Sequence, residues 1–402
     1  MRFLQFTDEW SKFAVSELLN TYPTNSLSWD KLSYIEKSEI KNIHYGLIHN
    51  GFKSTIINGN NQFIPFVNNS FIPKSYTLLQ DGDLILADAS EDRKDVGRPV
   101  EMINVDNQKI ISGLHTIHVR NKTNLLINGF KGFYFQSYAM KKQIYKIANG
   151  SKIYGISPSS LNTLFIFVPS KEEQQKIVNL LQKIEGRIET QSKIIENLYS
   201  QRKCIFLHLN NNYQHNKIKI NELGTVNIAN NLSKDDLVDD GRKCILYGEL
   251  FTKYDLYTTH IVSKTNKTYH TITSSGNDLL FPTSTTVNAL SLIKPLALCQ
   301  KDVILGGDMF SIKLNDTYNA IYISCLINYV YKKQLASKTQ GTTIVHLYYE
   351  NIKNEIIEIC DYEIQYKIAE YIKFITSKIE IEKELLNKLH LQKTYLLRNL
   401  FI

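Results

Sequence analysis

The sequence lacks the motifs by which most enzymes hold a nucleotide. Its 402 residues contain no Gly-x-x-x-x-Gly-Lys-Ser/Thr loop for ATP and no Gly-x-Gly-x-x-Gly turn. The eight prolines stand apart from one another, so the Asn/Asp-Pro-Pro-aromatic motif by which amino-methyltransferases grip a base is missing too. We therefore expect no catalytic site in this chain.

Cysteine is scarce, and long apolar runs are missing. The five cysteines form no Cys-x-x-Cys pair and have no neighbouring cluster of His or Asp that would complete a metal site. No basic segment followed by an apolar run opens the chain, and no stretch of 18 uncharged apolar residues occurs. We expect reduced thiols, no bound metal, no membrane segment and a cytoplasmic location.

No segment carries a strong charge of one sign. The net charge is +8, with 17 basic and 14 acidic residues in 1–150 and 14 basic and 11 acidic residues in 211–345. Such a balance permits a polyanionic partner without demonstrating one. The hydrophobic content of 43% is ordinary for a folded protein and too high for a disordered chain.

What the sequence does contain is a repeat at one fixed offset. The segment from Ser170 to Ile177 returns as the segment from Asp361 to Ile368, and 368 − 177 = 191. A period this long exceeds the 20 to 50 residues of solenoid units, so it predicts a duplicated domain-plus-helix. The repeat divides the chain into a domain at 1–155, a region at 156–210 with a helix at about 170–210, a domain at 211–345, and a region at 346–402 with a helix at about 361–401.

The two repeated helices carry a heptad seam that is interrupted by polar residues at the same places. In the first copy the seam comprises Ile177, Leu181, Ile184, Ile188, Gln191, Ile195, Leu198 and Arg202. In the second it comprises Ile368, Ile372, Ile375, Ile379, Glu382, Leu386, Leu389 and Lys393. A narrow stripe of period 3.5 is typical of a coiled coil, and the alternative is two helices that each lie on their own domain.

An antiparallel pairing of these helices would bring complementary polar residues together. Arg202 would meet Glu382, and Gln191 would meet Lys393, in a seam where polar residues often fix the register. Ser170 and Asp361 are the expected N-caps, and Ser170 with Glu173 forms a capping-box pattern.

The segments before the helices echo each other more faintly, in the same order along the chain. His44-Tyr45-Gly46 matches Leu246-Tyr247-Gly248, and Gly82-Asp83-Leu84 matches Asn277-Asp278-Leu279. Short apolar runs bounded by Gly, Asp, Asn and Pro indicate strands joined by turns. We predict an α+β fold, with two α/β-type domains separated by two long helices that pair as an antiparallel coiled coil with pseudo-two-fold symmetry.

This order of elements resembles the specificity subunit of type I restriction-modification systems. The resemblance covers the whole chain and rests on Gly150-Ser151, a short apolar strand that ends at Pro169, Glu173-Gln174-x-Lys176-Ile177 and the long helix. The opening from Arg2 to Trp10 and the segment from Cys244 to Leu250 also match the family. The departures are Ile364 at the place of Glu173, no proline equivalent to Pro169, and Leu47 at the place of Glu249.

The resemblance implies a function without catalysis. In that family two target recognition domains each read one half of a bipartite sequence in double-stranded DNA, and the helices hold them apart as a ruler. The helices also carry two modification (methyltransferase) subunits, to which restriction subunits add. Such a chain binds no cofactor itself, and S-adenosylmethionine and ATP with Mg²⁺ are used by the partner subunits. A scaffold or tether that reads no DNA, and a stand-alone methylation or restriction enzyme without recognisable motifs, remain as alternatives.

DNA reading requires Lys and Arg for phosphates, together with polar side chains on loops for base edges. Loops of that composition occur at 91–98, 120–124 and 263–270, with the solvated surface loop as the alternative for each. The histidine pairs His44/His49 and His115/His118 lack carboxylates at metal-ligand spacing; we expect His44 beside DNA or partly buried, and His115 and His118 on one strand. The candidate DNA contacts are Arg93, Lys94, Arg98, Arg120, Lys122, Lys264, Lys267, Thr268, Tyr269 and His270.

Overall fold

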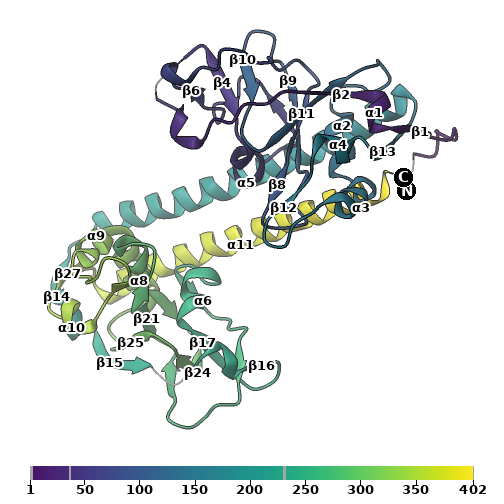
Figure 1. Ribbon diagram of the computed structural model, residues 1–402. Coiled ribbons are helices and arrows are strands. Elements are labelled where there is room, and N and C mark those ends of the chain that lie inside the picture. The colour runs from purple at the N-terminus through teal and green to yellow at the C-terminus, as the bar shows by residue number, and fades with distance from the viewer. Residues whose placement is uncertain (1–2, 36–37, 230–231, 402) are drawn as a thin grey trace. The chain divides into compact units, whose positions relative to one another are not determined.

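Figure 1 shows the computed structural model, which describes residues 3–35, 38–229 and 232–401. The chain forms two compact units, Met1–Lys193 with Lys383–Ile402 and Ile194–Glu382. Each unit holds one globular domain and a part of both long helices, α5 (Lys171–Asn211) and α11 (Tyr362–Asn399). The sequence division at 155, 210 and 345 follows the repeat, whereas the compact units divide each long helix between them.

Unit 1 is built around a five-stranded sheet whose three inner strands are largely buried. In spatial order this sheet comprises β2 (Leu19–Tyr22), β11 (Thr116–Asn121), β7 (Leu84–Ala87), β9 (Pro99–Ile103) and β5 (Ile56–Asn58). A second sheet comprises β10 (Lys109–Ser112), β4 (Ile40–Ile43), β6 (Phe66–Val67) and β3 (Leu32–Ser33). The helices of the domain are α1 (Val15–Leu18), α2 (Phe130–Gln136), α3 (Tyr138–Ile147) and α4 (Pro158–Leu161), with shorter turns at Trp29–Lys31, Leu47–Gly51 and Asn69–Phe71.

Unit 2 repeats this plan with its own loops. Its first sheet comprises β15 (Gly224–Ala229), β25 (Met309–Leu314), β21 (Asp278–Pro282), β23 (Leu296–Leu298) and β18 (Tyr257–Thr258). Its second sheet comprises β16 (Leu237–Val238), β19 (Lys264–Thr265), β17 (Arg242–Leu246), β24 (Lys301–Gly306) and β20 (Ile272–Ser275). The helices are α6 (Tyr247–Thr252), α7 (Ala289–Leu292), α8 (Ala320–Leu326), α9 (Lys332–Ala336) and α10 (Tyr349–Ile352), with shorter turns at Ile220–Glu222, Lys234–Asp236 and Ile327–Tyr331.

The weak sequence similarity between the two domains therefore reflects a shared topology. The five-stranded sheets have the same strand order, and β10 pairs parallel with β4 as β24 does with β17. The apolar runs at 84–86 and 301–305 form β7 and β24, and both strands are largely buried. In the first sheets helix α2 packs on β9, and helix α8 packs on β21 and β23. The α+β prediction is confirmed.

Short strand pairs join each domain to its long helix in the same way. In unit 1 they are β1 (Ser11–Ala14) with β13 (Phe165–Val168) and β8 (Ala89–Ser90) with β12 (Tyr154–Gly155). In unit 2 they are β14 (Asn216–Lys219) with β27 (Ile356–Ile359) and β22 (Ser284–Thr285) with β26 (Val345–His346). Gly150 and Gly341, which share a place in the repeat, both have positive φ, at 132° and 97°. A Cβ there would lie 1.8 and 2.1 Å from a backbone oxygen, so both positions require glycine.

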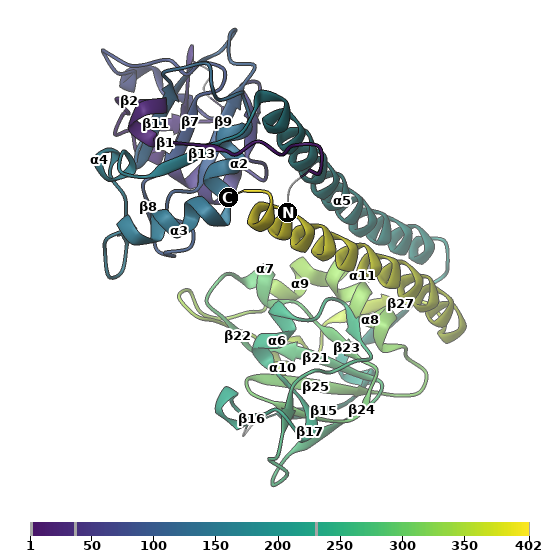
Figure 2. The same cartoon turned by 90° about the vertical axis from the view of Figure 1, so that its right-hand side faces the viewer.

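The two long helices run antiparallel within each unit (Figures 1 and 2). In unit 1 Lys393 bonds to Glu185, and in unit 2 Arg202 bonds to Thr376. Every seam residue predicted from the heptads is buried or half-buried. Near the end of α5 the buried residues no longer follow the heptad spacing, since Phe206 is fully buried while Ile205 is 38% exposed.

The expected register of the helix pair is wrong. The residue numbers 202 and 376 add to 578, as do 185 and 393, whereas the expected pairs add to 584. Arg202 therefore faces Thr376, six residues before Glu382, which is about 9 Å along a helix. The reason is that Arg202 finds its carboxylate in a domain loop, at Asp255, and Lys393 finds Glu185 within α5.

Both long helices begin directly after their predicted N-caps, Ser170 and Asp361. The Ser170 hydroxyl accepts the N–H of Glu173 at 3.3 Å, which is half of a capping box. The Glu173 carboxylate accepts the indole N–H of Trp10 at 3.2 Å. The carboxylate of Asp361 accepts a bond from Asn216 at 3.0 Å. Within the described residues, no helix is long and apolar enough to cross a membrane.

Candidate nucleic-acid interface

Each domain has a hollow beside the Tyr-Gly turn that the sequence repeats. In unit 1 the turn Tyr45-Gly46 follows β4, and in unit 2 the turn Tyr247-Gly248 follows β17. The first hollow, of about 540 Å³, is lined by Trp29, Tyr45, Gly46, His49, Asn50, Ala89, Ser90, Glu91, Asp95, His115 and Ile153. The second, of about 780 Å³, is lined by Leu232, Ser233, Lys234, Leu237, Leu246, Tyr247, Gly248, Glu249, Thr252, Lys253, Gly307 and Asp308.

The hollows correspond because the same two connections build them. One is the Tyr-Gly turn, and the other is the turn between the parallel partner strand and the next strand, at His115 in unit 1 and at Gly307-Asp308 in unit 2. Strand β4 pairs parallel with β10, and β17 pairs parallel with β24. In each unit both connections therefore leave the sheet at the same end of the strands. The backbone at His115 and at Gly307 has positive φ, 53° and 82°.

Rings are packed on one side of the first hollow. The ring of His44 lies 4.6 Å from that of Trp29 and 4.6 Å from that of Tyr45, and Tyr45 meets His115 edge-on at 5.2 Å. His44 is buried, and its Nδ1 accepts the N–H of Gly46 at 3.1 Å. Burial, together with the charge of nearby His115, lowers the pKa of His44 to about 4. His44 is thus a buried ring whose hydrogen bond to Gly46 stabilises the turn.

Ion pairs shape the floor of the first hollow. The Nδ1 of His49 lies 2.6 Å from the Asp95 carboxylate, and its Nε2 lies 2.9 Å from the carbonyl oxygen of Ala89. The hydrogen bond to Asp95 raises the pKa of His49. Arg98 donates to the carbonyl oxygen of His49 at 2.8 Å, so it stabilises the backbone that lines the hollow.

The second hollow replaces these rings by a Lys–Glu pair. The carboxylate of Glu249 accepts Lys253 Nζ at 2.5 Å, the hydroxyl of Ser263, and the N–H of Leu246 at 3.0 Å. Glu249 therefore closes the first turn of α6, whereas in unit 1 His44 accepts an N–H of the turn. The exchange of Glu249 for Leu47, noted in the sequence, accompanies this change of chemistry between two similar hollows.

The loop at 263–270 lies against the same turn in unit 2. Lys267 lines a smaller hollow of about 380 Å³ together with Gly307 and Asp308. Lys267 is 3.2 Å from Asp236, and Lys264 is 3.3 Å from Asp240. Thr268, Tyr269 and His270 are exposed, Tyr269 by 78%, and the ring of His270 lies 3.9 Å from that of Tyr269.

The predicted contacts of unit 1 fall in two places. Arg93, Lys94 and Arg98 belong to the loop beside the first hollow, where Arg93 donates to the carbonyl oxygen of Tyr145 at 2.6 Å and Lys94 is exposed. Arg120 and Lys122 lie at the far end of β11, five or more residues from His115, which is about 17 Å along a strand.

Arg120 and Lys122 both form hydrogen bonds to other residues of the same domain. Arg120 grips the buried Asp83 with two bonds of 2.7 Å, and His118 bonds the same carboxylate at 2.8 Å. Lys122 donates to the carbonyl oxygen of Ser16 at 2.5 Å. These positions give their predicted DNA contacts no support. His118 lies on β11 as expected, but His115 lies in the preceding turn and not on the strand.

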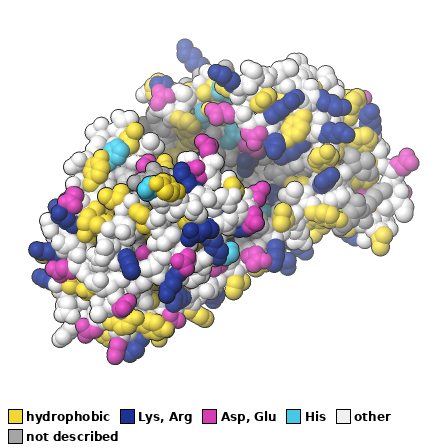
Figure 3. Space-filling model, turned by 90° about the horizontal axis from the view of Figure 1, so that it is seen from below, with side chains coloured by type: hydrophobic (Ala, Val, Ile, Leu, Met, Phe, Trp, Pro, Cys, Tyr) yellow, Lys and Arg dark blue, Asp and Glu magenta, His cyan; other side chains and the backbone are white. Residues whose placement is uncertain are grey.

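Trp29, Asp95, His115, Lys234 and Lys253 line the hollows but were not predicted as site residues. The Tyr-Gly repeat was the available signal, because it marks the turn around which they gather. On the face drawn in Figure 3, Lys and Arg side chains are interspersed with Asp and Glu, as the mild net charge indicated. The site thus offers rings, imidazoles and scattered cations, which suit contacts with bases and phosphates more than attack on a bond.

Comparisons with known proteins agree on one family. A profile described as the type I restriction modification DNA specificity domain matches residues 7–199 and again residues 213–391. The fold is similar to the crystal structure of the type I restriction-modification system S subunit from M. genitalium, at 15% identity and a TM-score of 0.55, over 99% of this chain and 97% of that chain.

A second solved structure gives the same result. It comes from work on complex assembly and conformational transition of the type I R-M system, with 12% identity and a TM-score of 0.57, over 98% of this chain and 99% of that chain. At such identities the likeness establishes the fold. A search of curated protein sequences finds no match.

Proposed function

This chain belongs to the type I restriction-modification DNA specificity family, and we propose that it reads a bipartite sequence in double-stranded DNA, with one domain for each half. The observation that carries the proposal is the repeated hollow. Each unit has such a hollow at the corresponding end of its sheet, and the side chains that line it differ between the units. This arrangement suits recognition of two different short DNA sequences, or words. Rings and cations at the hollows would contact bases and phosphates.

The helix pair would set the distance between the two words. A helix is a rigid spacer of 1.5 Å per residue, and the buried seam keeps α5 and α11 from sliding in either unit. A fixed separation of two domains would appear in DNA as a gap of constant length.

We propose α11 as a docking surface for modification subunits. Within unit 2 its exposed side carries Tyr371, Phe374 and Ile381, which are 58%, 74% and 66% exposed. Their spacing of three and seven residues places them on one stripe of the helix. Large apolar side chains left in solvent along one stripe mark an interaction site, and two methyltransferase subunits with added restriction subunits are the partners that the family suggests.

Catalysis would belong to those partners, with S-adenosylmethionine and ATP-Mg²⁺ bound there, in the cytoplasm. The test is to assemble the full chain with its modification subunits and select bound duplexes from a random pool. We expect two short words separated by a constant gap. A pool without sequence preference would make the chain a tether, and methyl transfer by the isolated chain would make it an enzyme.

A further inference from the structure

A cation of one long helix meets the other helix at equivalent places in the two units. Arg202 and Lys393 are related by the repeat, since 393 − 202 = 191, and so are Glu185 and Thr376, since 376 − 185 = 191. Arg202 donates to the hydroxyl of Thr376 at 3.0 Å, and Lys393 donates to the carboxylate of Glu185 at 2.7 Å. The two contacts are one contact of the repeat, made with different side chains.

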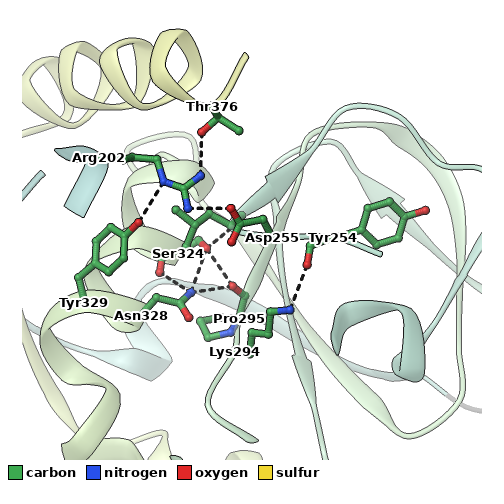
Figure 4. Close-up of polar contacts among 10 residues, drawn as sticks. Arg202, Tyr254, Asp255, Lys294, Pro295, Ser324, Asn328, Tyr329 and Thr376 are labelled. Atoms are coloured by element: carbon green, nitrogen blue, oxygen red, sulfur yellow. Dashed lines mark hydrogen bonds and ion pairs between the residues drawn. The ribbon is translucent and has the colours of Figure 1, made fainter. Parts of the chain in front are cut away.

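A third residue, from the globular domain, completes each junction. In unit 1 Thr55, directly before β5, donates its N–H to both carboxylate oxygens of Glu185 at 3.1 Å and its hydroxyl to one of them at 2.5 Å. In unit 2 Asp255, two residues before β18, accepts Arg202 at 2.7 Å (Figure 4). Strands β5 and β18 hold the same edge place in their sheets.

The carboxylate comes from a different element in each junction. In unit 1 the helix supplies the acid and the domain supplies a threonine. In unit 2 the helix supplies a threonine and the domain supplies the acid. Among the described residues, each junction pairs one carboxylate with one cation. Arg202, Glu185 and Thr376 are at most 7% exposed, whereas the Asp255 side chain is 38% exposed. At such burial an unpaired charge, or a second carboxylate beside the first, is strongly unfavourable.

The domain segments that reach into the junctions are held in place. Lys294 donates to the carbonyl oxygen of Tyr254, next to Asp255, at 3.1 Å (Figure 4). It also donates to the carbonyl oxygen of Phe251 at 3.1 Å. The hydroxyl of Tyr329 accepts Arg202 Nε at 3.2 Å. In unit 1 the carbonyl oxygen of Thr55 accepts the N–H of the buried Glu101 at 2.9 Å. These bonds hold both domain segments beside the long helices.

We propose that the two junctions match each domain to its own part of the helix pair. A domain of the first kind fits where the helix supplies Glu185, and a domain of the second kind fits where the helix supplies Thr376. The first domain at the second place would leave Arg202 without a carboxylate, and the second domain at the first place would set two carboxylates against Lys393. Resting on the proposed function, the junctions fix which DNA word is read at which end.

Point variants reproduce both mismatches within unit 2 of the full-length chain. Asp255→Thr removes the carboxylate with which Arg202 is paired, as the first domain would, and Thr376→Glu adds a second one. The double variant Asp255→Thr/Thr376→Glu restores one carboxylate for one cation, with the acid on the helix as in unit 1. Thermal unfolding of the chain without DNA is the readout, and Glu384→Thr, which removes an exposed acid of α11 paired with Lys388, is the control.

We expect each single variant to lower the melting temperature by roughly 10 °C and the double variant to regain most of that loss, with the control unchanged. If the double variant is no more stable than the worse single variant, or if the single variants melt as the wild type does, the proposal is wrong. Because no DNA enters the measurement, a chain that binds no specific sequence would refute the proposed function and leave this result standing.

Discussion

Gln174 and Gln365 make the same two hydrogen bonds at the starts of the two long helices. The side-chain oxygen of Gln174 accepts the N–H of Ile127 at 3.0 Å, and its amide donates to the carbonyl oxygen of Pro169 at 3.0 Å. For Gln365 the partners are Asn319 at 3.0 Å and Cys360 at 2.7 Å. Each buried glutamine therefore ties its long helix to the backbone before the covering helix of the sheet.

Replacing either glutamine by alanine will destabilise its unit. Gln174→Ala leaves buried backbone groups without partners, which costs about 2 to 4 kcal/mol in the free energy of unfolding, and Gln365→Ala will have an effect of similar size. Urea unfolding of the full chain measures the loss. Gln175→Ala is the matched control, since Gln175 is exposed and bonds only to Asn179 along the helix. Equal stability of Gln174→Ala and Gln175→Ala would contradict the role of the pair.

His44 makes the stability of the first domain depend on pH. Its folded pKa of about 4 lies below the unfolded value of about 6.5, so the neutral ring stabilises above pH 6.5 and the benefit is lost as the pH falls toward 4. The slope is at most about 1.4 kcal/mol per pH unit for one proton.

The variant His44→Asn isolates this dependence. Its side-chain oxygen can still accept the N–H of Gly46, but it does not titrate. Melting temperatures between pH 7 and pH 4.5 should fall less steeply for His44→Asn than for the wild type. Parallel curves for the two proteins would show that His44 does not carry the effect.

Replacing Lys264 and Lys267 together by alanine will weaken DNA binding of the assembled complex. Two lost phosphate contacts reduce the slope of log affinity against log salt by at most about 1.8. Both lysines are paired with aspartates, so the variant Asp240→Asn should act in the opposite direction by freeing Lys264. An unchanged salt slope in the double alanine variant would remove this loop from the interface.

Substitutions of two exposed aromatic residues should distinguish docking of the modification subunits from DNA binding. Phe374→Ala is expected to weaken assembly with the modification subunits by about tenfold or more, because a large apolar side chain would be buried there. Tyr269→Ala, at the DNA-reading loop of the same unit, should leave assembly intact and lower the affinity for target DNA. Co-purification and DNA binding of both variants measure this, and loss of assembly in Tyr269→Ala only would reverse the assignment.

Sequence predicted those parts of the fold that depend on local patterns. The seam from Ile177 to Arg202 follows from heptads, and the paired turns at Gly150 and Gly341 follow from the repeat. The register of the helices could not be predicted, because the carboxylate that holds Arg202 belongs to Asp255 in a domain loop. The buried ion pair of Glu101 and Lys131, 2.9 Å apart, has no equivalent pattern in the second half and left no signal.

The candidate site was predicted less fully than the fold. Loop composition identified Lys267, which lines the smaller hollow beside Gly307 and Asp308, and the exposed Tyr269. The residues Trp29 and His115 reach the first hollow from segments on either side of Tyr45, because β4 pairs with β10 across the sheet. A parallel pairing between distant strands is set by the packing of the whole domain, so composition along the chain does not reveal which turns will meet.

The most direct test of the account is to sequence the methylated sites of cells with the chain, cells without it, and cells carrying a Tyr269→Ala/His270→Ala chain. We expect a motif of two words with a constant gap that disappears without the chain. In the variant the word read by the second domain should relax, while the other word and the gap stay unchanged. A single contiguous motif, or a motif that persists without the chain, would contradict the claim that two domains read two words.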